Sequence, residues 1–231
     1  VSAIVALLVF LLIPETKPVR VNGEKEESTA ESFGGYLRVL KDGRFIAFVA
    51  TCTLVAFVYM NFNTTLGVYL RDYHGIPESG YGWLISINAM MVVLLQFPIT
   101  RRIEKRPPMV MMALGSLFYG LGFGLYGLVS SYPMFVVAMA ILTIGEMIIV
   151  PVTSALVAAF APEEMRGRYN FIFGFSWGIS FAIGPYMAGM IMDNHNPDLL
   201  WASCMIIGTI SAMLFLVMNR SARPKVASTP M

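Results

Sequence analysis

Six long runs of apolar residues dominate this 231-residue sequence and limit the folds that it can adopt. Each run has about the 20 residues that an α-helix needs to cross a bilayer. Hydrophobic residues make up 57% of the chain and charged residues only 13%, against about 25% in a typical soluble domain. The sequence therefore predicts an all-α integral membrane protein with a six-helix transmembrane bundle at residues 45–219. The expected spans are 45–70, 82–100, 109–129, 134–160, 169–192 and 199–219.

A further apolar run at residues 1–13 is too short to span a bilayer. It starts without Met and lacks the basic segment that opens a signal peptide. We therefore expect residues 1–13 to be the end of a transmembrane helix, and the chain to be a fragment of a larger protein.

Lys and Arg are distributed unevenly among the loops between the spans. If residues 14–44 are cytoplasmic, alternation of the spans places all but one of the 16 Lys and Arg inside, and only Arg71 outside. This bias follows the positive-inside rule and predicts a multi-pass protein of the inner membrane. The linker 14–44 and the tail 220–231 would be cytoplasmic. The basic residues would then face membrane lipid, so the net charge of +2 does not indicate a nucleic-acid partner.

The linker changes character along its length. Residues 14–32 are rich in Pro, Gly, Ser and Glu, which indicates a flexible segment. Apolar residues then recur at helical spacing while basic residues occupy the other faces. This pattern predicts a short amphipathic helix on the inner membrane surface, with a solvated loop as the alternative. Its apolar positions are Phe33, Tyr36, Leu37 and Leu40.

One carboxylate, Glu146, lies near the middle of the otherwise uncharged span 134–160. An ionisable group near the bilayer midplane costs about 3 kcal/mol on insertion scales, so it must be hydrated, protonated or paired. No Lys or Arg occurs within the expected spans to form an ion pair with it. We therefore expect Glu146 to bind a coupling proton or a cationic substrate group. The alternative is a packing role, in which Glu146 hydrogen-bonds to a neighbouring helix.

Other polar side chains in the spans should face the protein interior, because lipid offers them no partners. They recur at helical spacing in the spans 45–70 and 134–160, with one more in 82–100. The pattern predicts that they line one central cavity; hydrogen bonding between packed helices is the alternative. These residues are Asn61, Thr64, Thr65, Asn88, Thr143 and Thr153. Pro151, Gly184 and Pro185 interrupt regular helix and are candidate hinges.

The sequence shows no pattern typical of catalysis or metal binding. Cys52 and Cys204 lie in expected spans without ligand spacing around them. No phosphate-binding Gly-rich loop and no nucleophile elbow occurs. We therefore expect neither an enzyme nor a bound cofactor.

Several segments together resemble the C-terminal half of a major facilitator superfamily transporter, nearest to bacterial drug and proton antiporters. They are Ala161-Pro162-Glu163-Glu164-Met165-Arg166-Gly167-Arg168-Tyr169, Gly184-Pro185, and Gly145-Glu146 followed by Pro151. The resemblance covers essentially the whole chain. It implies helices 7 to 12 of a twelve-helix fold, with residues 1–13 ending helix 6 and residues 14–44 as the central loop. The missing N-terminal six-helix half would then be a partner of this chain.

The resemblance also implies two gating loops. The family has a basic loop motif between its second and third helices and a weaker copy between its eighth and ninth. Aligning residues 105–107 with the end of that motif places Arg101 at its Asp and Glu104 at a Gly. The residues concerned are Arg101, Arg102, Glu104 and Arg106; a plain basic anchor is the alternative. In the second loop, Arg166-Gly167-Arg168, the glycine would let the chain reverse tightly.

The sequence thus predicts part of a secondary active transporter. The function expected first is proton-coupled efflux of small amphipathic compounds by alternating access, with the substrate and protons as partners. A proton-linked sugar or metabolite importer is one alternative. A non-transporting membrane scaffold or sensor is another.

Overall fold

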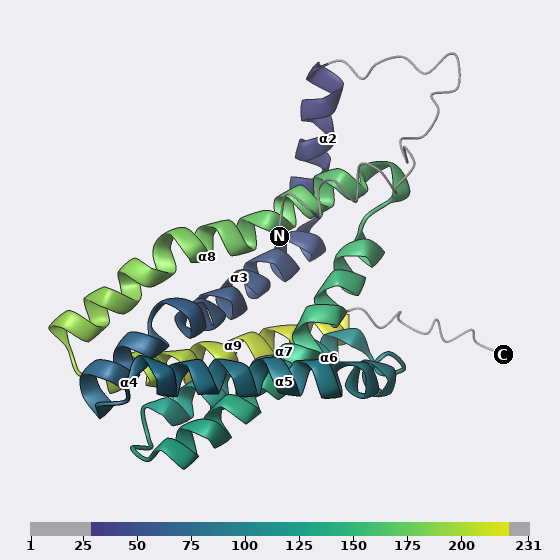
Figure 1. Cartoon of the computed structure of the whole chain (residues 1–231). Helices are drawn as coiled ribbons and strands as arrows, with labels where there is room; N and C mark the ends of the chain where they lie inside the picture. The colour runs from purple at the N-terminus through teal and green to yellow at the C-terminus, as the bar shows by residue number, and fades with distance from the viewer. Residues whose placement is uncertain (1–28, 222–231) are drawn as a thin grey trace, which may run out of the picture. The chain divides into compact units, whose positions relative to one another are not determined.

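The computed structural model describes residues 29–221, and every regular element in that stretch is a helix (Figure 1). Six helical segments are long and apolar enough to cross a membrane, which confirms the predicted six-helix bundle. The sequence predictions for residues 1–28 and 222–231 lie outside the described residues. The elements are α2 (Thr29–Lys41), α3 (Gly43–Thr64), α4 (Leu66–His74), α5 (Glu78–Ile103), α6 (Pro108–Tyr126), α7 (Tyr132–Phe160), η1 (Glu163–Met165), α8 (Arg166–Asn194) and α9 (Asp198–Ser221).

The first expected span, 45–70, is interrupted in the structure. Helix α3 ends at Thr64 and α4 begins at Leu66, with Thr65 between them at φ −119°. The hydroxyl of Thr64 donates to Met60 O at 2.8 Å, and the Asn61 amide donates to Phe57 O at 3.0 Å. Side chains that bond to the backbone of their own helix in this way often bend it, and these two lie directly before the break.

The chain divides into two units, residues 1–34 and 35–231, and helices α3 to α9 lie in the second. Within it, α5 packs on α7, α7 on α6, α6 on α9, α9 on α3, and α3 on α8. This set of contacts is symmetric. If α3 is exchanged with α7, α5 with α8 and α6 with α9, the same five pairs of helices are in contact. The bundle therefore has the internal repeat of two helix triplets.

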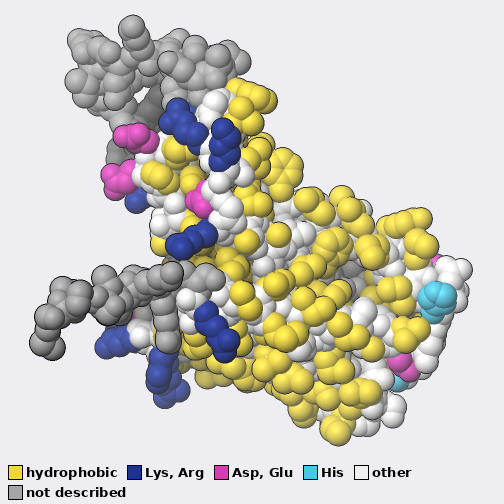
Figure 2. Space-filling model, turned by 180° about the vertical axis from the view of Figure 1, so that it is seen from behind, with side chains coloured by type: hydrophobic (Ala, Val, Ile, Leu, Met, Phe, Trp, Pro, Cys, Tyr) yellow, Lys and Arg dark blue, Asp and Glu magenta, His cyan; other side chains and the backbone are white. Residues whose placement is uncertain are grey.

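Burial differs along this row of helices. The buried share is 67% in the central helix α6 but only 11% in α5 and 22% in the segment that contains α8, the two ends of the row. Large apolar side chains of α5 and α8 are exposed, among them Val93 and Phe181. Figure 2 shows a broad hydrophobic surface on the face of the molecule opposite to that seen in Figure 1. A surface of this kind needs lipid or another protein against it.

Glycines set how closely the helices approach. A Cβ added at Gly122 of α6 would lie 2.6 Å from the backbone nitrogen of Leu142 in α7. At Gly208 of α9 it would lie 2.6 Å from the Cα of Gly120 in α6. Small residues allow such backbone contacts, and packing drives helix association in a membrane. Helix α6 is thus fixed between α7 and α9.

The connections between spans gather at two opposite ends of the bundle. At one end, the ring of Phe45 at the start of α3 packs on Phe160 and Tyr169, which flank the connection from α7 to α8. At the other end, the Tyr69 hydroxyl in α4 donates to Asp198 Oδ1 at 2.8 Å. Lys and Arg side chains gather at the first end in Figure 2.

Arg71 lies at the second end, where the positive-inside count had placed it alone. It pairs with its neighbour, since Arg71 Nε lies 2.7 Å from Asp72 Oδ1. This hydrogen bond lowers the pKa of the Asp72 carboxyl below its ordinary value. The positive charge of Arg71, which departs from the positive-inside rule, is therefore compensated by the neighbouring carboxylate of Asp72.

The arrangement of the two ends predicts which positions can be labelled from outside the cell. Lys105→Cys in the loop from α5 to α6 and Asp193→Cys in the last turn of α8 replace exposed residues at opposite ends of the bundle, and each is made in a protein without Cys52 and Cys204. We expect an impermeant maleimide added to intact cells to label position 193 only, because the positive-inside rule predicts that the basic end faces the cytoplasm. Labelling of both positions from outside would contradict this topology.

The close approach at Gly122 predicts a loss of stability. We expect Gly122→Ala to lower the free energy of unfolding by about 1–3 kcal/mol, because the new methyl group meets backbone that cannot turn aside. Gly174→Ala in α8 is the matched control, since nothing lies within 4 Å of its added Cβ. Unfolding in detergent measures both, and equal stability of the two variants would refute the packing argument.

Candidate functional site

Glu146 lies on α7 and is hydrogen-bonded from two other helices. The hydroxyl of Tyr59 in α3 donates to Glu146 Oε1 at 3.0 Å. The amide nitrogen of Asn88 in α5 donates to Glu146 Oε2 at 2.8 Å. Both partners are neutral, so the carboxylate is held by hydrogen bonds. Three helices of the bundle therefore meet at this one side chain.

The Asn88 amide connects Glu146 to a second predicted residue. Its nitrogen also donates to Thr143 Oγ1 at 2.9 Å, and the Thr143 hydroxyl donates in turn to Met139 O at 2.7 Å. Asn88 and Thr143 are buried, while Glu146 is only partly buried. The structure thus brings Glu146, Asn88 and Thr143 into one polar cluster, which is held by hydrogen bonds between packed helices.

The cluster can satisfy Glu146 both with and without a proton. The ionised carboxylate only accepts hydrogen bonds, and Tyr59 and Asn88 supply two donors. A protonated carboxyl also donates one. The Tyr59 hydroxyl can rotate to accept that bond, because a hydroxyl serves as donor and acceptor. A change of protonation at Glu146 therefore needs no large rearrangement of its neighbours.

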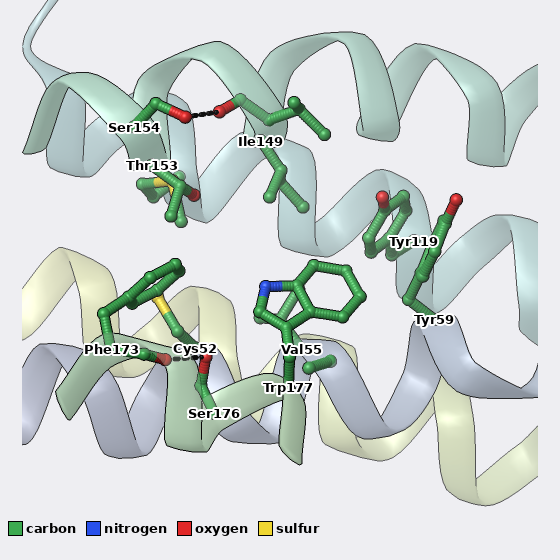
Figure 3. A pocket seen from close by; sticks show the side chains of 13 residues that line it. Cys52, Val55, Tyr59, Tyr119, Ile149, Thr153, Ser154, Phe173, Ser176 and Trp177 are labelled. Carbon is green, nitrogen blue, oxygen red and sulfur yellow. Dashed lines mark hydrogen bonds between the residues drawn. The ribbon is translucent and has the colours of Figure 1, made fainter. Parts of the chain in front are cut away.

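A cavity of about 150 Å³ lies next to this cluster, between α3, α6, α7 and α8. Figure 3 shows Tyr59 and Tyr119 at one end of it, Trp177 in the middle, and Thr153 at the other end. The Tyr59 ring stacks on Tyr119 with centroids 5.7 Å apart and meets the edge of Trp177 at the same distance. Tyr59 thus joins the two features, since its ring lines the cavity and its hydroxyl binds Glu146.

The cavity opens toward the surface of the bundle. Trp177 is 42% exposed and Val150, another lining residue, is 51% exposed. Thr153 lines the deeper part, where its hydroxyl lies 3.3 Å from the sulfur of Met112. An apolar and aromatic wall with a few hydroxyls suits an amphipathic molecule.

The remaining polar residues expected in one cavity lie elsewhere. Asn61 lines a separate cavity of about 210 Å³ between α3, α8 and α9, where its amide nitrogen lies 3.7 Å from Cys204 Sγ. The hydroxyls of Thr64 and Thr65 lie 3.1 Å from each other at the break between α3 and α4. These three residues are therefore not part of the cluster around Glu146.

The loop from α5 to α6 contains the first set of predicted gating residues. Glu104 and Arg106 line a cavity of about 330 Å³ between the ends of α5 and α7, and Pro151 lies on its α7 side. Arg101 stacks over the ring of Phe97, 4.5 Å from its centroid. Arg102 is exposed.

The second predicted gating loop differs from its expected form. The chain reverses at residues 161–165, and Gly167 lies within the first turn of α8. Among the described residues only Gly75 has a positive φ, so the prediction of a tight turn at Gly167 was wrong. Pro162 and the short helix η1 make the reversal instead. Arg166 pairs with Glu163 at 3.6 Å, and Arg168 lies over the ring of Tyr36.

The predicted hinge residues lie inside two helices. Pro151 is within α7, five residues after Glu146, and Pro185 is within α8. Gly184 faces α3, where an added Cβ would lie 3.5 Å from Met60 Cβ. Their role in motion stays a prediction.

Sequence reasoning missed the aromatic residues Tyr59, Tyr119 and Trp177. Aromatic residues are common in membrane spans, so the sequence does not single out any one of them as a site residue. A signal for Tyr59 did exist, because a tyrosine hydroxyl inside a span needs a hydrogen-bond partner and Glu146 was an available acceptor.

Known proteins are similar to this chain in sequence and in fold. Residues 51–230 match the family model of the Major Facilitator Superfamily. A Na(+), Li(+), K(+)/H(+) antiporter of Planococcus maritimus is 28% identical over 191 residues, covering 73% of this chain and 45% of that protein. Multidrug resistance protein MdtH of Shigella boydii is 30% identical over 191 residues, covering 80% of this chain and 46% of that protein. The chain spans about half the length of these curated relatives.

A solved structure shows the same fold at low sequence identity. The crystal structure of a POT family transporter in complex with a thioalcohol-conjugated peptide aligns with a TM-score of 0.68 and 16% identity. The alignment covers 82% of this chain and 45% of that chain. This likeness concerns the fold alone.

The polar cluster predicts energetic coupling between Asn88 and Glu146. We expect Asn88→Leu to cost about 1.5–3 kcal/mol of unfolding free energy, because it removes a hydrogen bond to a charged group. The cost should fall by about half or more when Glu146→Leu is already present, and a double-mutant cycle measures this. Ser86→Ala is the control on the same helix, since its hydroxyl bonds to Gly82 O of α5 itself. Strictly additive effects of Asn88 and Glu146 would argue against the cluster.

Proposed function

The chain belongs to the Major Facilitator Superfamily, and we propose that it forms the C-terminal half of a proton-coupled secondary transporter that exports small amphipathic compounds. The observation that supports this most directly is Glu146, an intramembrane carboxylate held by neutral donors beside an aromatic cavity. Structural carboxylates in membranes are usually paired with a cation. A carboxylate that exchanges a proton needs the opposite arrangement, with neighbours that suit both of its states.

The similar proteins support the same class of activity. One is named for exchange of monovalent cations with protons and another for multidrug resistance. In the proposed transporter, the exposed apolar faces of α5 and α8 contact the missing N-terminal half. The cavity beside Glu146 would then be one wall of a site between the two halves. Alternating access would follow from rocking of the two helix triplets around that site.

Exchange of a proton for substrate follows from the contacts of Tyr59. When Glu146 holds a proton, the Tyr59 hydroxyl accepts from it and the carboxyl is neutral. When the proton leaves, the carboxylate attracts a cationic or proton-donating group of a substrate. The rings of Tyr59, Tyr119 and Trp177 form the apolar surface beside it, and aromatic faces also attract cations. Substrate and proton would thus compete for one carboxylate.

The proposed orientation follows the charge distribution. The linker and the C-terminal tail lie on the cytoplasmic side, with the loops from α5 to α6 and from α7 to α8. Helix α2 leaves Leu37 and Leu40 exposed beside the basic Arg38 and Lys41. This composition suits the surface of an anionic inner leaflet. In this orientation the loop that holds Glu104 and the first turn of α8, which holds Arg168, act as cytoplasmic gates.

The proposal predicts the effect of Glu146→Gln in the full-length transporter. Glutamine keeps the size and can accept a hydrogen bond, but it cannot exchange a proton. We expect proton-driven flux to fall by at least about tenfold, a loss of about 1.4 kcal/mol, with normal folding and expression. The flux that remains should no longer depend on pH over the range in which the wild type does.

Flux in proteoliposomes under an imposed pH gradient measures this, across a pH series and at matched protein amounts. Glu164→Gln is the control, because Glu164 is an exposed carboxylate in the connection between α7 and α8. A Glu146→Gln variant with normal rates and the wild-type pH profile would make Glu146 a packing residue. Wild-type protein with no flux for any tested organic cation, sugar or inorganic cation would favour a scaffold or sensor.

A further inference from the structure

Pro151 creates an unpaired backbone group one residue after Glu146. In an α-helix the carbonyl of residue i accepts from the N–H of residue i+4. Proline has no N–H, so within α7 the carbonyl of Met147 receives no bond from position 151. Inside a bilayer an unsatisfied carbonyl costs several kcal/mol, and a neighbouring group must supply the missing donor.

The donor comes from another helix. The side-chain amide nitrogen of Gln96 in α5 donates to Met147 O at 3.0 Å. The same nitrogen donates to Thr100 Oγ1, also at 3.0 Å, one turn further along α5. These two bonds use both hydrogens of the amide group. Thr100 therefore orients the amide, and Gln96 replaces the hydrogen bond that Pro151 cannot make.

This contact lies at a boundary between packed and open structure. Before it, Asn88 joins α5 to Glu146 and Thr143 on α7. Beyond it, α5 and α7 border the cavity of about 330 Å³ that Thr100 and Pro151 both line. The part of α7 that follows Pro151 thus has free space on its α5 side. Gln96 makes the last polar contact between the two helices before that space.

We propose that Gln96 is a positioning residue for transport, which fastens α7 to α5 beside Pro151 and so fixes Glu146 relative to Asn88. This proposal rests on the function proposed above for Glu146. Gln96 does not touch the carboxylate. It acts through the carbonyl of the next residue, Met147, and keeps the helix turn that holds Glu146 in register with α5 while the segment beyond Pro151 moves.

A double-mutant cycle with Pro151 tests this in the full-length transporter. Gln96→Leu keeps the size of the side chain but removes the donor. We expect the maximal flux to fall by at least about tenfold with KM changed by less than about twofold, since a small misplacement of a reacting group slows the step strongly. Pro151→Ala restores an N–H that can pair Met147 O within α7. In that background Gln96→Leu should have little further effect on flux.

The matched control is Ser86→Ala, which removes another polar group of α5 without touching α7. Equal losses from Gln96→Leu in both backgrounds would overturn the proposal, because the role of Gln96 would then be independent of the proline. A loss confined to protein amount, with a normal rate per molecule, would overturn it too.

A spectroscopic measurement separates this proposal from the function proposed for Glu146. Spin labels at the exposed positions Val93 in α5 and Ala158 in α7 report the distance between α5 and the part of α7 that follows Pro151, in protein without Cys52 and Cys204. We expect one narrow distance distribution in the parent, a broader one with Gln96→Leu, and a narrow one again with Gln96→Leu and Pro151→Ala together. This result is independent of flux. An unchanged distribution in Gln96→Leu would refute the fastening, whereas normal flux in Glu146→Gln would refute only the coupling role.

Discussion

A hydrocarbon environment offers no hydrogen-bond partners, and the arrangement of this bundle depends on that constraint. Each polar group inside the spans must find a partner in the protein, and these partners join particular helices. Glu146 draws α3 and α5 to α7 through Tyr59 and Asn88. The Met147 carbonyl draws α5 to α7 a second time through Gln96. Asn88 and Gln96 thus join α5 to α7, although the burial of α5 within the bundle is small.

Apolar packing sets the positions of the other helices. Helix α6 approaches α7 at Gly122 and α9 at Gly120 so closely that no side chain fits between the backbones. The aromatic rings at the basic end then fill the space between α3, α7 and α8. The cavity beside Tyr59 remains because α7 and α8 contact each other little, while each is packed tightly on a different helix. The rigid α6 and α9 core therefore supports a site on a more open face.

The sequence predicted the fold well, because the length and hydropathy of a span are properties of one segment. Length and hydropathy were therefore enough to predict the six spans and to show that Glu146 lies inside one of them. It grouped the cavity residues less well, because helical spacing tells which residues share a face but not which helix lies opposite. Asn61 and Tyr59 illustrate this. Asn61 shares α3 with Tyr59, yet it faces α8 and α9, while Tyr59 faces Glu146. The break at Thr65 was also not predicted, since hydropathy does not distinguish a continuous helix from two consecutive ones.

A proline in a membrane helix is usually described as a flexible point, but its effect depends on what replaces the lost hydrogen bond. At Pro151 the replacement comes from α5, so any bend of α7 there changes a bond between two helices. Asn88 joins the same two helices at the carboxylate itself. In the proposed transporter, motion beyond the proline and a change of protonation at Glu146 would therefore act on one interface. A small change in the bond to Asn88 would alter how firmly α5 holds α7, and this gives a physical route from Glu146 to the end of α7 that follows Pro151.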